Sequence, residues 1–160
     1  MKEEACSPDV PDGENLLALD NQVCFALYAV NRAVTARYRP LLAELDLTYP
    51  QYLVMLVLWE AAARDERLRV STIGDKLRLD SGTLTPLLRR LEQRGLVSRK
   101  RSTEDERVVT VALTEGGEAM QEQAREVPVR LLCELGVDGG QAARLREDLR
   151  QLLKRLESVD

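Results

Sequence analysis

Three cysteines are the side chains of this sequence best suited to chemistry: Cys6, Cys24 and Cys133. A thiolate is a nucleophile, a metal ligand and a site of oxidation. No two of them form a Cys-x-x-Cys pair, which argues against a zinc ribbon or a thioredoxin-type motif. The sequence has no histidine, which excludes Ser-His-Asp and Cys-His hydrolases and histidine-containing zinc sites. We predict no catalytic residues, no metal and no cofactor.

The surroundings of the cysteines leave two interpretations open. Cys24 lies four residues after Asp20 and four before Tyr28, beside an apolar helical stripe. From this spacing alone, a buried structural cysteine is the commoner interpretation, since a free cysteine behaves as a small hydrophobic side chain. The alternative is a reactive thiol. The same two interpretations apply to Cys133, and we can assign no role to Cys6.

The overall composition indicates one cytoplasmic domain. The 160 residues are 44% hydrophobic and carry a net charge of −4, and one domain per ~150 residues is usual. An odd, sparse cysteine count suggests a reducing compartment, and the acidic N-terminus lacks the features of a signal peptide. The longest apolar run, residues 52–59, is far shorter than the ~20 residues that span a membrane. We expect a flexible tail over residues 1–14, a single domain over residues 15–160 and no membrane association.

Hydrophobic periodicity predicts the elements that position these residues. Apolar residues at helical spacing favour a long helix over about 15–45, which Pro40 should break or kink near Arg39. Thr48 is a good N-cap for a buried helix that reaches about Ala63. A charged loop follows at 64–69. Helices are also expected over about 115–158, with a kink at Pro128.

Residues 71–113 have the order of a winged helix-turn-helix. A short helix over 72–78, capped by Ser71, precedes a second helix that starts at Asp80 and ends near Gly95. The periodicity then changes to that of strands, and a hairpin is expected from the segments 96–101 and 107–113. The predicted fold is mainly α with a small β-hairpin wing, the winged helix-turn-helix covering about 48–113.

This block predicts binding to double-stranded DNA. The first residues of the second helix of such a motif reach base edges in the major groove. Between Arg89 and Arg107, seven basic and four acidic residues leave a local charge of +3. The alternative is an ordinary solvated charged surface. The residues expected to contact DNA are Ser81, Gly82, Thr83, Thr85, Pro86, Arg89, Arg99, Asp105 and Arg107.

The long helices that flank this block, about 15–45 and 115–158, suggest a homodimer. Helices of two subunits that interleave would set two recognition helices against two half-sites related by a two-fold axis, as in a pseudo-palindromic operator. The alternative is that they pack together in the core of a monomer.

At this point the sequence resembles the MarR family of winged-helix repressors, and within it the organic-hydroperoxide-responsive regulators (OhrR-like). The resemblance covers about residues 16–158 and is carried by four stretches: Leu19-Asp-Asn-Gln-Val-Cys-Phe-Ala-Leu-Tyr28, Leu47-Thr-Tyr-Pro-Gln-Tyr-Leu-Val-Met55, Leu79-Asp-Ser-Gly-Thr-Leu-Thr-Pro-Leu-Leu88 and Glu104-Asp-Glu-Arg-Val108. The loop over 61–68 is a few residues longer than is usual in the family.

The resemblance implies a dimeric repressor with a reactive cysteine in its first helix, which corresponds to Cys24. In the family two tyrosines hydrogen-bond the cysteine sulfur, and they correspond to Tyr38 and Tyr49. Cys133 corresponds to the resolving cysteine of the two-cysteine class, so the resemblance implies a disulfide with Cys24 of the other subunit. A sulfenic acid and then a disulfide are the expected products of oxidation.

One geometric condition follows for the tyrosine contact. Cys24 and Tyr38 are 14 residues apart, which is ~21 Å along a helix at ~1.5 Å per residue. A tyrosine side chain does not reach that far within one helix. Contact therefore requires Tyr38 of the other subunit or a helix that folds back.

Four functions remain in competition. The first is a repressor that senses organic hydroperoxides through Cys24, whose apolar neighbours should favour organic peroxides over H₂O₂. The second is a MarR-like repressor that a small aromatic ligand releases, with Cys24 structural. The third is a thiol peroxidase, which would consume many equivalents of peroxide. The fourth is a helical interaction module that does not bind nucleic acid.

Overall fold

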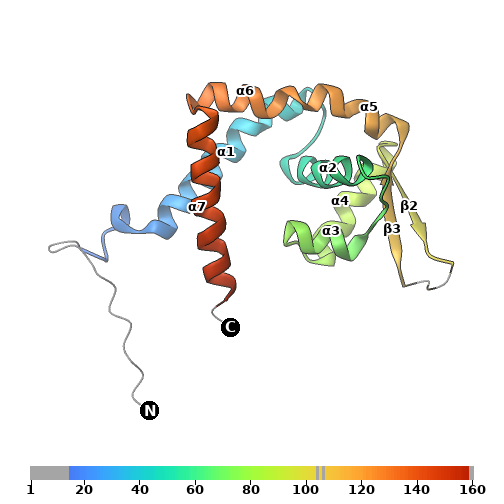
Figure 1. Cartoon of the computed structure of the whole chain (residues 1–160), viewed down its shortest axis with the longest axis horizontal. Helices are drawn as coiled ribbons and strands as arrows, with labels where there is room; N and C mark the ends of the chain where they lie inside the picture. Colours follow the sequence, from blue (N-terminus) through green and yellow to red (C-terminus); the bar gives the residue numbers. More distant parts are fainter. Residues whose placement is uncertain (1–14, 104, 106, 159–160) are drawn as a thin grey trace, which may run out of the picture. The chain divides into compact units, whose positions relative to one another are not determined.

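The computed structural model describes residues 15–103, 105 and 107–158 of the chain (Figure 1). These residues belong to two compact units, one that ends at Ala36 and one that begins at Arg37. The expected tail over 1–14 and Cys6 lie outside the described residues. No helix in the described part of the chain is long and apolar enough to cross a membrane.

The first helix lies within the predicted range of 15–45, but it starts later than predicted and has no break. A short 3-10 turn, η1 (Leu19–Asn21), precedes α1 (Val23–Ala43), which continues through Pro40. The prediction of a break near Arg39 was therefore wrong. Proline is costly inside a helix because it removes a hydrogen bond and crowds the preceding turn, yet Leu41 and Leu42 directly after it are buried in the core. Burial of this last turn offsets the local cost.

Helix α2 (Tyr49–Ala62) forms the centre of the second unit. Thr48 caps it as predicted, since its side chain accepts a hydrogen bond from the Gln51 backbone while the Gln51 side chain accepts one from the Thr48 backbone. This reciprocal pair is a capping box. Eight of its fourteen residues are buried, which confirms the prediction of a helix surrounded by other elements.

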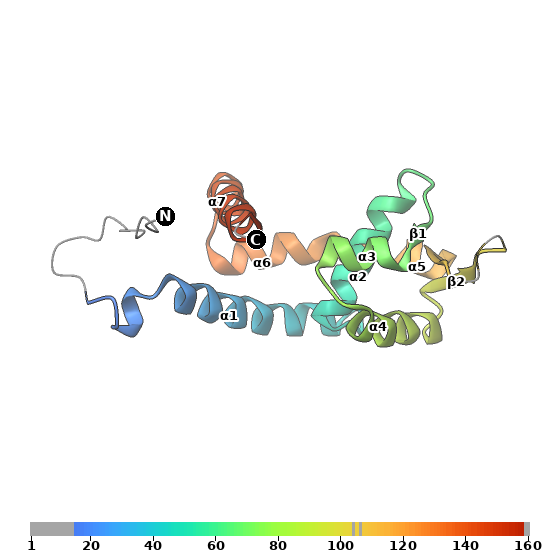
Figure 2. The ribbon, with the colours of Figure 1, turned by 90° about the horizontal axis from the view of Figure 1, so that it is seen from below.

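The helix-turn-helix consists of α3 (Val70–Leu77) and α4 (Ser81–Gln93), as Figure 2 shows from below. The predicted cap at Ser71 was wrong: the helix starts two residues earlier than predicted, at Val70, directly after strand β1 (Leu68–Arg69). Ile73 of α3 and the leucines of α4 at 84, 88 and 91 are almost completely buried. The three leucines follow the 3.6-residue period of a helix with one core face.

The wing belongs to a three-stranded antiparallel sheet in the order β1-β3-β2. Strands β2 (Val97–Arg101) and β3 (Val109–Leu113) form the predicted hairpin, with Val97 opposite Leu113 and Arg101 opposite Val109. The two-residue strand β1 (Leu68–Arg69) pairs with β3 on its other side and was not predicted. It lies in the segment expected to be a charged loop.

Three helices complete the second unit: α5 (Glu115–Ala124), α6 (Glu126–Leu135) and α7 (Gly139–Glu157). Thr114 caps α5 through the Gly117 amide, as expected of a threonine before a helix. The interruption between α5 and α6 falls at Arg125, three residues before the predicted kink at Pro128. A proline in the first turn of a helix is well tolerated, and Pro128 occupies that position in α6.

A buried hydrogen bond joins α2 to α5, where the Trp59 indole nitrogen donates to the Gly117 carbonyl at 2.8 Å. Gly117 lies against the backbone at the start of the wing. A Cβ added to it would be only 2.1 Å from the Leu96 carbonyl oxygen. This close approach requires glycine. The neighbouring Gly116 has more room, with the nearest atom 3.4 Å from an added Cβ.

The replacement Gly117→Ala should destabilise the protein by about 1–3 kcal/mol, the usual range for overpacking a core. The matched control Gly116→Ala should leave stability unchanged or raise it by up to about 1 kcal/mol, since alanine favours a helix over glycine. Urea denaturation followed by circular dichroism measures both. Equal effects of the two substitutions would contradict the close approach at Gly117.

Candidate DNA-binding surface and cysteine sites

The start of α4 is held by Asp80, its N-cap. The Asp80 carboxylate accepts hydrogen bonds from the Thr83 amide and the Thr83 hydroxyl, both at 2.9 Å. These bonds lower the pKa of Asp80, because they stabilise its charged form. The Thr83 hydroxyl therefore takes part in the cap. Its predicted contact with DNA stays a prediction.

The outer face of α4 collects most of the residues predicted to read DNA. A shallow groove of about 490 Å³ runs along it. Two further residues, Arg90 and Gln93, share the groove and were not predicted. Their helical spacing from Pro86 could have identified them, because i+4 and i+7 positions lie on one face. The groove is lined by Ser81, Gly82, Thr85, Pro86, Arg89, Arg90 and Gln93.

In the wing, the predicted DNA contacts have partners inside the chain. The Arg99 guanidinium binds the Glu92 carboxylate, with N–O distances of 2.5 and 2.8 Å. This pairing lowers the pKa of Glu92 and fixes β2 to the last turns of α4. Asp105 accepts a hydrogen bond from the Arg107 backbone amide at 2.9 Å, which shapes the turn that presents Arg107. Arg107 itself is exposed.

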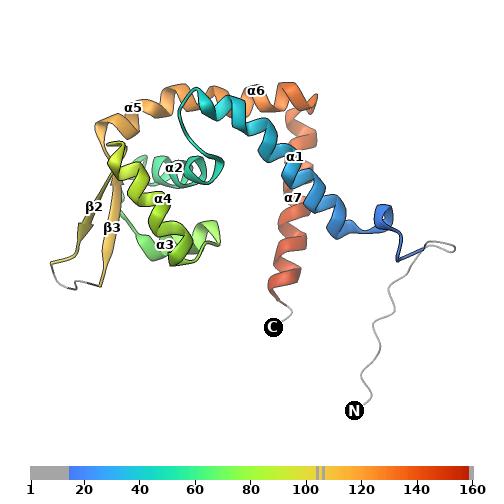
Figure 3. The same ribbon diagram turned by 180° about the vertical axis from the view of Figure 1, so that it is seen from behind.

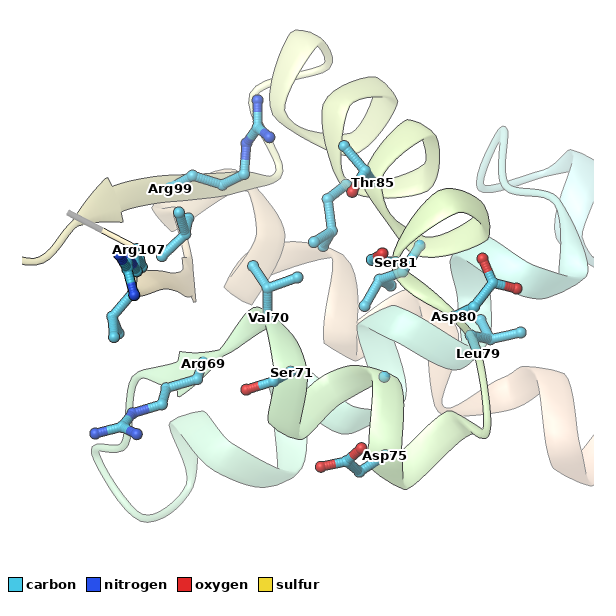
Figure 4. Close-up of a pocket in the computed structure, with 15 residues that line it drawn as sticks. Arg69, Val70, Ser71, Asp75, Leu79, Asp80, Ser81, Thr85, Arg99 and Arg107 are labelled. Atoms are coloured by element: carbon cyan, nitrogen blue, oxygen red, sulfur yellow. The ribbon is translucent and has the colours of Figure 1, made fainter. Parts of the chain in front are cut away.

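A cavity of about 600 Å³ lies between α3, α4 and the wing. Figure 4 shows arginines on the strand side of this cavity and hydroxyl side chains on the helix side. Leu84 and Leu88 contribute apolar surface. The charged residues that line the cavity are Arg69, Arg99, Arg107, Asp75 and Asp80. Apolar walls with a few charged groups are typical of small-molecule sites.

Both cysteines that the structure describes, Cys24 and Cys133, are free and exposed. The chain itself does not bury Cys24, so the interpretation as a structural core cysteine has no support within one chain. Cys24 belongs to the unit that ends at Ala36, whereas Tyr38, Tyr49 and Cys133 belong to the other unit. Their predicted meeting stays a prediction.

The predicted tyrosines do lie together. The ring centroids of Tyr38 and Tyr49 are 4.7 Å apart, and Tyr52 lies 5.8 Å from Tyr38. Burial, and then the neighbouring Tyr49 and Tyr52, raise the pKa of Tyr38 to about 12. Burial also raises the pKa of Tyr49. Both hydroxyls thus stay protonated near neutral pH and can donate hydrogen bonds.

Large apolar side chains are exposed on the helices predicted to form a dimer. On α1, Val23, Leu27 and Val30 surround the position of Cys24 and are 37–64% exposed. On α6 and α7 the exposed group comprises Val129, Leu135, Leu145, Leu149, Leu153 and Leu156. Contiguous exposed apolar surface usually marks an interaction site.

Comparison with known proteins agrees with this arrangement. The family model "Transcriptional regulator SarA/Rot" matches residues 36–123. The organic hydroperoxide resistance transcriptional regulator of Bacillus subtilis is 49% identical over 143 residues, which cover 89% of this chain and 90% of that protein.

Solved structures give the same result. AbfR of Staphylococcus epidermidis, solved in reduced form on DNA, is 38% identical with a TM-score of 0.70, over 88% of this chain and 96% of that one. Its disulfide form covers 88% of this chain and 93% of that one, with a TM-score of 0.64. A MarR variant from E. coli on operator DNA is 27% identical with a TM-score of 0.68, over 80% and 91% of the two chains. The chain belongs to the MarR family of winged-helix transcriptional regulators, in the group that includes the organic hydroperoxide regulators.

Proposed function

We propose that this regulator is a homodimeric repressor that senses organic hydroperoxides through Cys24 and leaves its DNA operator when Cys24 is oxidised. The observation that carries the proposal is the free, exposed thiol of Cys24 on an apolar helix face of a DNA-binding protein. The relative from Bacillus subtilis is named for organic hydroperoxide resistance. AbfR has been solved both reduced on DNA and with a disulfide.

The exposed apolar faces of α1, α6 and α7 support a dimer, because a second copy would remove them from water. Burial of apolar surface is the main driving force of such association. In the dimer, each outer face of α4 would meet one half-site. Half-sites about one DNA turn apart, ~34 Å, fit a two-fold arrangement.

The oxidation proceeds in two balanced steps. The Cys24 thiolate attacks the distal oxygen of a hydroperoxide ROOH, the O–O bond breaks, and RO⁻ takes up a proton and leaves as the alcohol ROH. Cys24 is then a sulfenic acid. The Cys133 thiol of the partner subunit attacks the sulfenic sulfur, the disulfide forms, and water leaves. Val23 and Leu27 would favour an organic R group over the hydrogen of H₂O₂.

Tyr38 and Tyr49 are proposed to donate hydrogen bonds to the Cys24 thiolate in the dimer. Hydrogen bonds to the charged form of a group stabilise it, and the thiolate is the reactive form. The rings of Tyr38 and Tyr49 lie together, 4.7 Å apart, so one thiolate could accept hydrogen bonds from both hydroxyls.

A second candidate function is release by a small aromatic ligand, with Cys24 structural. The observation in its favour is the cavity between α3, α4 and the wing, with its apolar walls and a few charged groups. In that case DNA release would be indifferent to thiol blocking. The redox proposal instead requires that blocking the thiols abolishes the release of DNA by peroxide.

Replacement of the cysteines tests the redox proposal. Cys24→Ser should bind operator DNA as tightly as wild type but no longer release it with cumene hydroperoxide. Cys133→Ser should still form the sulfenic acid, detected with dimedone, but no intersubunit disulfide on a non-reducing gel. Fluorescence anisotropy measures the binding. Release of Cys24→Ser by peroxide, or equal oxidation rates of wild type with cumene hydroperoxide and H₂O₂, would contradict the corresponding part of the proposal.

Removal of the Tyr38 hydroxyl tests its role at the thiol. Tyr38→Phe should slow the oxidation of Cys24 by roughly 10- to 150-fold, since a hydrogen bond to a charged group contributes about 1.5–3 kcal/mol. The control Tyr28→Phe removes an exposed hydroxyl that accepts from Arg32 at 2.8 Å, and it should leave the rate unchanged. Stopped-flow oxidation by cumene hydroperoxide gives both rates. Indistinguishable rates for the two variants would remove Tyr38 from the mechanism.

Replacement of one arginine in the groove on α4 tests DNA recognition. Arg89→Gln should weaken operator binding about tenfold, the range of one good base contact. If the lost contact is to a phosphate, the slope of log K against log salt should fall by about 0.9 per contact. Arg146→Gln, an exposed arginine on α7, is the matched control and should bind as wild type does. Anisotropy titrations at several salt concentrations distinguish these outcomes.

A further inference from the structure

The turn that ends α1 is unusually well defined. The Leu47 amide donates to the Leu42 carbonyl and the Asp46 amide to the Ala43 carbonyl, both at 3.0 Å. This pair of bonds is the Schellman motif that closes a helix. The residue in the left-handed position of the motif is Asp46, with a φ of 51°, where glycine is usual. A side chain at this position is tolerated where other contacts hold the turn.

Arg94 supplies those contacts from the end of α4. Its guanidinium donates to the Asp46 carbonyl and, at 3.1 Å, to the Leu45 carbonyl, and it lies 3.4 Å from the Asp46 carboxylate. Three acceptors on two adjacent residues thus face one planar, five-donor group. Arg94 is the C-cap residue of α4. The last turn of α1 and the end of the recognition helix are therefore joined directly.

The residue just before this turn makes a second connection. The Glu44 carboxylate binds Arg130 of α6 through both oxygens, at 2.9 and 2.8 Å. Arg130 precedes Cys133 by three residues, so the two lie about one helical turn, ~4.5 Å, apart along α6. The helix that carries the second cysteine is thus attached to the same turn of α1.

We propose that residues 44–46 form a junction through which a displacement of α6 at Cys133 reaches the recognition helix α4. This inference rests on the proposed redox function. Glu44 receives the movement of α6 through Arg130, and Arg94 passes it to α4. Glu44, Arg94 and Arg130 are positioning residues; none of them takes part in the thiol chemistry.

The strength and placement of the contacts support a positional role. Glu44 is 61% exposed and Arg130 is 44% exposed, and exposed ion pairs contribute little to stability. Their removal should therefore leave the fold intact. Residues 44–46 are consecutive in a turn that is closed by its own hydrogen bonds. A shift at Glu44 therefore moves Leu45 and Asp46 with it. Figure 3 shows α5 and α6 crossing the top of the unit and α4 running down toward α3.

The first experiment needs no peroxide. Glu44→Gln, Arg94→Gln and the double variant are titrated with operator DNA in the reduced state. If both residues act through one junction, the effect of Glu44→Gln on the dissociation constant should largely disappear once Arg94 is Gln. Additive effects of the two substitutions would overturn the junction, since independent sites add. Arg94→Lys keeps the charge but loses the planar set of donors that reaches several acceptors at once. It should therefore behave as Arg94→Gln does.

The second experiment measures the ratio of the dissociation constants of oxidised and reduced protein. Glu44→Gln should lower this ratio about fivefold or more, the lower end of allosteric couplings, while the yield of the Cys24–Cys133 disulfide stays that of wild type. The reversed pair Glu44→Arg with Arg130→Glu should restore the ratio. Glu60→Gln, which removes an exposed carboxylate that binds Arg64 and Lys76, is the matched control and should keep it.

The outcomes distinguish the two proposals. A wild-type protein that peroxide does not release, together with non-additive effects in the reduced state, would overturn the redox function and support the junction. A wild type released by peroxide, with an unchanged ratio in Glu44→Gln and additive effects, would keep the redox function and overturn the junction.

Discussion

The burial of α2 is the constraint on which the DNA-binding part of the molecule depends. Its residues contact α3, α4, α5 and the sheet, and eight of its fourteen residues are buried. Val54 and Met55 are fully buried, and each buried aliphatic side chain contributes about 1.5–3 kcal/mol. Apolar packing is not directional. The hydrogen bond from Trp59 to Gly117 therefore helps to fix the orientation of α5 against α2. Both the recognition helix and the wing contact this element.

The sequence predicts well those features that depend on local patterns. The Thr48 cap, the Asp80 start of α4 and the hairpin each depend on a short stretch of sequence, and each was found where expected. The break expected near Pro40 was wrong because it followed from a local rule alone. The helix continues to Leu41 and Leu42, which are buried in the core. Strand β1 was missed because two residues acquire strand character only by pairing with β3, more than 40 positions later.

The candidate site shows the same division. The small and hydroxyl residues of α4 could be predicted as part of the candidate DNA-binding surface, because they stand at the start of a helix. The partners of Arg99 and Arg94 could not, because Glu92, Leu45 and Asp46 become neighbours only in the folded chain. Arg99 had been counted with the DNA-facing charges, yet its guanidinium binds Glu92. Sequence patterns identify a charged face, whereas only the fold shows which of its charges are already paired.

Helix α7 extends these considerations beyond a single chain. It has nineteen residues and a capping box at Asp138, yet none of its side chains is buried by the part of the chain described here. A helix owes most of its stability to packing of its apolar face. In the proposed dimer a second copy would cover this face, and by mass action the stability of α7 would then rise with the concentration of the protein. That dependence on concentration would exist before any oxidant arrives.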